Sequence, residues 1–199
     1  MSKPELIKWS GWAFIAGSFA FITILSGSDA IAFPGSIMSA ILLAAGTLYL
    51  RAGYGENVSR LGRNILLMGV IGMVLWYVAL ASLTIMYYSG TLLATEAQGE
   101  RLWPVIFGGP AVVLLTLTLF GLTTLRNKPM SRLNWLPILA GIWYPAGYSF
   151  LFGYIFSHSG VFPESYWPVI KFTFGIQFLA LCLLGFILVS DSPKKMATA

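Results

Sequence analysis

Six long apolar runs follow one another along the chain, and each is long enough to cross a bilayer as a helix. They lie near residues 10–28, 33–51, 64–88, 103–125, 134–157 and 167–190. A span of the hydrocarbon core needs about 20 apolar residues in helical conformation. The runs are continuous, whereas the strands of a membrane β-barrel alternate between apolar and polar residues. The sequence therefore predicts an all-α integral membrane protein with six transmembrane helices in a compact bundle.

The composition is unlike that of a soluble domain. Hydrophobic residues make up 57% of the chain and charged residues only 10%, whereas soluble domains carry about 25% charged residues. The connections between the runs are short, and the longest, near 52–63 and 89–102, have only linker length. We therefore expect residues 1–199 to form a single six-span domain.

The distribution of positive charge predicts the orientation of the bundle. Only Arg101 and Lys171 fall on one side of the predicted topology. The other side holds the remaining ten basic residues: Lys3, Lys8, Arg51, Arg60, Arg63, Arg126, Lys128, Arg132, Lys194 and Lys195. Loops rich in Lys and Arg stay in the cytoplasm. We therefore expect both termini to be cytoplasmic, in a bacterial inner (plasma) membrane, and we interpret the basic residues as an insertion signal and not as a nucleic-acid site.

Short stretches of the sequence repeat. "ERLWPVIF" at 100–107 recurs as "ESYWPVIK" at 164–171, and the second, fourth and sixth runs each open with an aromatic residue followed by proline. Duplicated helical hairpins would explain the repeat. Convergence explains it as well, because proline suits the first turn of a helix and tryptophan suits the membrane interface.

Lys171 is the one full charge inside an apolar run. It follows Trp167 by four residues, about 6 Å along a helix, so we expect it near the outer interface. One interpretation is structural: the ammonium group extends to the headgroups or pairs with Glu164 or Asp29. The other is functional, with Lys171 binding an anionic or carbonyl group of a ligand.

The last two runs contain further candidate ligand-binding residues. Gln177 lies six residues after Lys171, and we expect its amide to hydrogen-bond to another helix. Tyr144, Tyr148 and Phe152 share one side of the fifth run at helical spacing. This aromatic side is either ordinary packing or one wall of a pocket for a planar apolar ligand, such as a lipid or a pigment.

Small residues recur at helical spacing in the first two runs, where they would let helix backbones approach closely. The partner helix belongs either to this chain or to a neighbouring subunit, and we expect docking of a partner on these faces. The predicted helix-packing residues are Ala13, Ala16, Ala20, Ser36, Ala40 and Ala44.

The AxxxA spacing of Ala16 and Ala20 also resembles a known family. Together with six spans and cytoplasmic termini, it is similar to the substrate-binding component of energy-coupling-factor vitamin transporters. In that family the pattern on the first helix meets the transmembrane coupling protein. The resemblance implies an alternative function, a small-molecule binding or transport component.

Several classes of catalytic and metal site have no counterpart in the sequence. No phosphate-binding GxxxxGK[ST] loop, HExxH, GxSxG or CxxC motif occurs, and no carboxylate falls inside a predicted span. With one cysteine, Cys182, and one histidine, His158, we expect no disulfide and no metal site. We therefore expect a non-enzymatic accessory or scaffold subunit of a larger membrane complex. Its expected partners are membrane lipids and other membrane subunits, with no nucleic acid, and its only expected cofactor is a bound lipid or planar apolar ligand.

Overall fold

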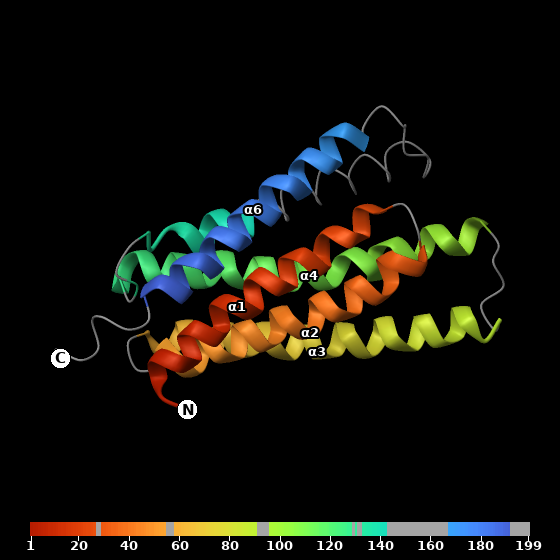
Figure 1. The fold of residues 1–199 in the computed structure, drawn as a ribbon. Coiled ribbons are helices and arrows are strands. Elements are labelled where there is room, and N and C mark those ends of the chain that lie inside the picture. Colours follow the sequence, from red (N-terminus) through yellow and green to blue (C-terminus); the bar gives the residue numbers. More distant parts are fainter. Residues whose placement is uncertain are drawn as a thin grey trace.

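A computed structural model shows the chain as a set of long helices lying side by side (Figure 1). It describes residues 1–26, 29–54, 58–90, 96–128, 130, 133–142 and 167–191. No strand occurs in these ranges, so the all-α prediction is confirmed for them. Residues 136–142 are helical, and the other elements are α1 (Lys3–Ile22), the 3-10 turn η1 (Thr23–Ser26), α2 (Asp29–Tyr54), α3 (Arg60–Tyr88), α4 (Glu96–Asn127) and α6 (Trp167–Asp191).

The helices close into a ring. α1 packs between α2 and α6, α2 lies beside α3, and α3 lies beside α4 (Figure 1). The helical stretch 136–142 packs on α4, because a methyl group on Gly121 would lie 2.6 Å from the backbone nitrogen of Ile138. A hydrogen bond from Gln177 of α6 to the carbonyl oxygen of Ala140 joins this stretch to the last helix. Each helix therefore has a neighbour on both sides.

Three helices contain a segment that is long and apolar enough to cross a membrane. These segments are Pro34–Tyr54 in α2, Arg60–Ala79 in α3 and Lys171–Ser190 in α6. In the part of α4 whose side chains the structure describes, the apolar segment is Val112–Asn127. Most of the predicted span 134–157 lies outside the described residues, so six spans remain a proposal.

α1 begins earlier than the apolar run that predicted it. The backbone N–H of Ser2 donates a hydrogen bond to Glu5 Oε2 at 2.7 Å, and the Ser2 side chain accepts one from the backbone of Glu5. This capping box starts the helix at Lys3. The hydrogen bond from the Ser2 backbone N–H, and after it one from the Ser2 side-chain hydroxyl, stabilise the ionised carboxylate and hold the pKa of Glu5 below its usual value. The helix therefore begins seven residues before the predicted span at 10–28 and ends at Ile22.

α2 also starts ahead of its predicted opening at Phe33 and Pro34. It begins at Asp29, so Pro34 lies inside the helix and not in its first turn. Because proline has no N–H, one helical hydrogen bond is missing at this point. α6, in contrast, begins at Trp167 with Pro168 in its first turn, as the sequence predicts.

A side-chain clamp fixes the turn after α4. Asn134 accepts a hydrogen bond from the backbone N–H of Met130 through Oδ1 and donates one through Nδ2 to the Met130 carbonyl oxygen, both at 2.9 Å. The carbonyl oxygen of Asn134 accepts from Thr124 Oγ1 at 2.7 Å. Lys128 and Leu133 take the left-handed conformation here, with φ of 45° and 51°. The hydrogen bonds offset the cost of placing two side-chain-bearing residues in this region.

The described core is apolar, and its hydroxyl groups donate to backbone oxygens. Ser10 Oγ donates to the carbonyl oxygen of Gly46 at 2.7 Å, and Ser39 Oγ donates to that of Gly17 at 3.0 Å. Both bonds join α1 to α2. No Asp, Glu, Lys, Arg or His side chain belongs to the buried set in the part of the chain that the structure describes. Packing and neutral hydrogen bonds therefore hold the bundle together.

The helices differ in length. α3 and α4 have 29 and 32 residues, or about 43 and 48 Å at 1.5 Å per residue, whereas α1 has 20 residues and is about 30 Å long. Figure 1 shows α3 and α4 extending past the end of α1 on the side away from the N-terminus.

Candidate functional site

Gln177 is the polar residue buried most deeply among the predicted ligand-binding residues. Its side chain is 1% exposed. Nε2 donates to the carbonyl oxygen of Ala140, so the expected interhelical hydrogen bond is confirmed. Oε1 is buried and has no hydrogen-bond donor within the described ranges. One turn earlier on α6, Phe174 contacts Phe21 of α1 with ring centroids 5.4 Å apart.

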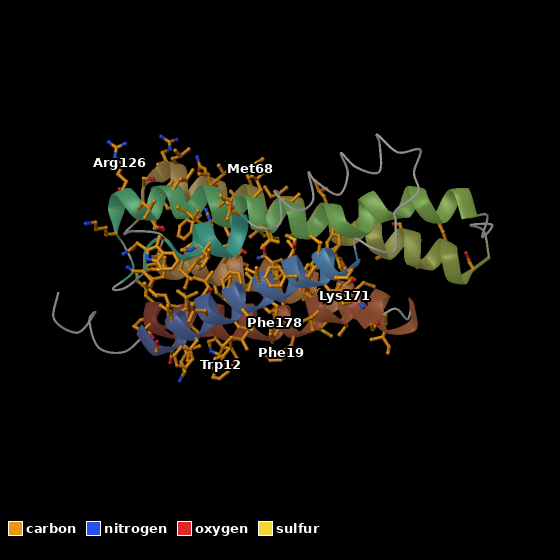
Figure 2. All side chains as sticks on the ribbon, turned by 90° about the horizontal axis from the view of Figure 1, so that it is seen from above. Trp12, Phe19, Met68, Arg126, Lys171 and Phe178 are labelled. Atoms are coloured by element: carbon orange, nitrogen blue, oxygen red, sulfur yellow. The ribbon has the colours of Figure 1, made fainter. Side chains whose placement is uncertain are left out.

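Lys171 lies apart from Gln177. Its side chain is exposed on α6, near the end of α1 that is remote from the N-terminus (Figure 2). Six residues separate the two side chains, which places them about 9 Å apart along the helix and on different faces. The structure therefore does not bring the two predicted ligand-binding residues together. Lys171 has no carboxylate partner among the side chains that the structure describes. The expected partners, Glu164 and Asp29, are not among these described side chains.

The aromatic wall of the fifth run cannot be compared with the structure. Tyr144, Tyr148 and Phe152 lie outside the described residues, and so does His158. The predicted pocket for a planar apolar ligand stays a prediction.

The small residues divide between core and surface. Ala13 is buried against α2, since a methyl group on Gly46 would lie 3.4 Å from the Ala13 Cβ. Ser36 and Ala40 are almost fully buried inside this chain, and Ala44 is half-buried against the core. The expectation that a partner docks on the Ser36/Ala40/Ala44 face is therefore wrong, because the chain fills that face itself.

The outward side of α1 has a different character. Trp9, Trp12 and Phe19 are exposed at spacings of three and seven residues, and the exposed Ala16 lies between the last two. Ala20 next to this row is half-buried. In Figure 2, Trp12 and Phe19 lie on the opposite side of the bundle from Met68 and Arg126. We call Trp9, Trp12, Ala16 and Phe19 the α1 stripe.

Glycines make the closest helix contacts, and the sequence reasoning missed them. A methyl group on Gly185 of α6 would lie 2.5 Å from the Gly11 carbonyl oxygen of α1. A methyl group on Gly141 would lie 2.7 Å from the Thr118 backbone nitrogen. Such approaches need residues without a Cβ. The only sequence signal was the isolated glycines within apolar runs, which do not reveal their partners.

One end of the bundle collects positive charge. The N-terminus and the ends of α2, α4 and α6 all lie at this end (Figure 1). Arg51 at the end of α2 is half-buried, and its Nε has no acceptor in the described part. We call this the basic end, and its exposed described cations are Lys3, Lys8, Arg60, Arg63, Arg126 and Lys128.

The described ranges contain no group of three or more His, Cys, Asp or Glu side chains placed to hold a metal ion. Comparisons of the chain with protein-family models, with curated proteins and with solved structures found no match.

Proposed function

We propose that the chain is a six-span protein of the bacterial inner membrane that acts, without catalysis, as an accessory or scaffold subunit of a larger membrane assembly. Its basic end would face the cytoplasm, together with both termini. A buried core without ionisable side chains in the described ranges supports packing over ion-coupled transport, because an ion crossing a membrane needs charged or polar partners along its path.

The observation that carries the proposal is the α1 stripe. Tryptophan and phenylalanine side chains stand out from α1 with a small residue between them. Large side chains on either side of a small one would give a second transmembrane helix a broad contact surface, and also a point where its backbone can approach α1 closely. α2 and α6 flank α1, and Phe19 packs edge-on against Phe178 of α6 with ring centroids 5.0 Å apart. The rest of the stripe is exposed.

We expect thiol labelling to place the basic end in the cytoplasm. In a Cys182→Ala background, an impermeant thiol reagent added to intact cells should label Ser159→Cys and should label Ser59→Cys only after lysis. The physical reason is the retention of basic loops on the inner side. Labelling of Ser59→Cys in intact cells would overturn the orientation.

We expect Ala16→Leu to release the chain from its partner without unfolding it. Leucine fills the gap between Trp12 and Phe19 and keeps a partner helix at a distance, but Ala16 is exposed and touches no core. The measurement is the apparent mass of the protein after mild detergent extraction from its native membrane, with thermal unfolding recorded in parallel.

Ala79→Leu is the matched control, since Ala79 is an exposed alanine on α3. It should leave the assembly intact. If Ala16→Leu and Ala79→Leu leave the apparent mass equally unchanged, the stripe is a lipid-facing surface and the accessory role fails.

One observation favours the alternative, a small-molecule binding or transport component. The buried Oε1 of Gln177 has no donor among the described residues, and a ligand N–H or O–H group would satisfy it. Purification as a monomer that retains a small solute, with loss of the solute in Gln177→Leu, would favour this function over the accessory role.

A further inference from the structure

Four cations from two helices meet on one side of the basic end. Arg60 and Arg63 lie in the first turn of α3, and Arg126 and Lys128 lie at the end of α4. The two helix ends are in direct contact, because a methyl group on Gly62 would lie 2.8 Å from Thr123 Oγ1. All four side chains are exposed, and Figure 2 shows Arg126 extending away from the bundle.

These four cations have no carboxylate partner within the described residues. Glu5 is the one acidic residue whose side chain the structure describes, and it is engaged in capping α1. The first turn of α3 contains no acidic residue. Cations there also face the positive end of the helix dipole, which is unfavourable without an anion nearby. Within the described residues, all four cations are therefore open to contact with an anionic ligand.

The surface next to the cluster is apolar. Leu61 and Met68 on α3 and Leu122 and Leu125 on α4 are exposed on the turns that carry or follow the cations. In Figure 2, Met68 lies on the same side of the bundle as Arg126. A free anion would not bind to these apolar side chains, whereas the acyl chains of a lipid would cover them.

We propose that Arg60, Arg63, Arg126 and Lys128 bind the phosphate group of an anionic phospholipid whose acyl chains lie along the exposed leucines and Met68. The inference rests on the membrane insertion in the proposed function and is independent of the accessory role. Each cation near an anionic headgroup contributes enough to change the affinity about fivefold.

The test is a lipid titration of the full chain in detergent, followed by native mass spectrometry. Phosphatidylglycerol and phosphatidylcholine with identical acyl chains are compared, and inorganic phosphate is added as a competitor. We expect clear preference for phosphatidylglycerol, with Arg63→Gln and Arg126→Gln each weakening its binding about fivefold. Lys8→Gln, at an exposed cation of α1 outside the cluster, should leave the binding unchanged.

Arg63→Lys and Arg126→Lys keep the charge and should keep the preference, which separates loss of charge from misfolding. Equal binding of the two lipids, or unchanged binding in both glutamine variants, would overturn the inference. Displacement of phosphatidylglycerol by inorganic phosphate at similar concentration would also overturn it, since the site would then recognise phosphate alone. Failure of the accessory role would appear in the Ala16→Leu experiment and leave this titration unaffected.

Discussion

Gly185→Ala should separate α1 from α6 and lower the free energy of unfolding by about 2–3 kcal/mol. The new methyl group would lie 2.5 Å from the Gly11 carbonyl oxygen, 2.7 Å from Ile15 Cγ1 and 3.2 Å from the Ile15 backbone nitrogen. Two of these atoms belong to the backbone of α1 and cannot rotate away. The helices must therefore move apart along the whole crossing, including the contact of Phe21 with Phe174.

Gly175→Ala is the matched control on the same helix. No atom of the described residues lies within 4 Å of the position that its methyl group would take. We expect a change within about 1 kcal/mol, in the stabilising direction, because alanine favours helix more than glycine does. Unfolding in sodium dodecyl sulfate, followed by tryptophan fluorescence, measures both variants. An equal loss of unfolding free energy in Gly185→Ala and Gly175→Ala would show that helix propensity, and not the α1–α6 crossing, determines the effect.

Phe14→Ala should lower the free energy of unfolding by about 3 kcal/mol. The ring of Phe14 is fully buried and lies between α1 and α2, where a methyl group on Gly46 would be 3.4 Å from Cδ1 and Cε1. Its removal leaves a cavity that rigid helices cannot close. Phenylalanine-to-alanine changes in cores cost about 3–5 kcal/mol, and we expect the lower end because unfolding within a membrane transfers the ring to lipid and not to water.

Phe172→Ala makes the same chemical change on the surface, since the Phe172 side chain is 69% exposed. Its effect should be within about 0.5 kcal/mol. The same unfolding titration compares the two variants. A loss for Phe172→Ala as large as that for Phe14→Ala would mean that a further contact covers α6 in the folded protein.

Hydropathy located the apolar middle of the helices but not their starts. α2, α3 and α6 contain the segments that runs of apolar residues predict. α1 and α2 start at Lys3 and Asp29, before the apolar runs. At Lys3 the reason is that the residues of the capping box are polar and lie outside the apolar run. The Ser2 and Glu5 pair shows that the sequence contains signals for helix caps. Such a signal places the start of the helix before the start of the apolar run.

For a buried polar group, the sequence predicted the kind of partner but not which residue that partner would be. A lone amide such as Gln177 inside an apolar helix must find an acceptor, so an interhelical hydrogen bond was expected, but Ala140 as its acceptor was not. The same limit applies to Ser36 and Ala40, where spacing predicted close packing and misassigned the partner. Which helices are neighbours depends on the contacts that close the ring, such as the one between Gly11 and Gly185. These contacts join residues far apart in the chain, so no single stretch of sequence reveals them.

α3 and α4 are too long for the hydrocarbon layer of a membrane. At about 43 and 48 Å they exceed its thickness of about 30 Å. With Arg60 and Arg126 held in the inner headgroup layer, the far ends of this helical hairpin would stand two to three turns above the outer boundary. In the proposed orientation, these helix ends would form a small stalk in the periplasm that a soluble partner could reach.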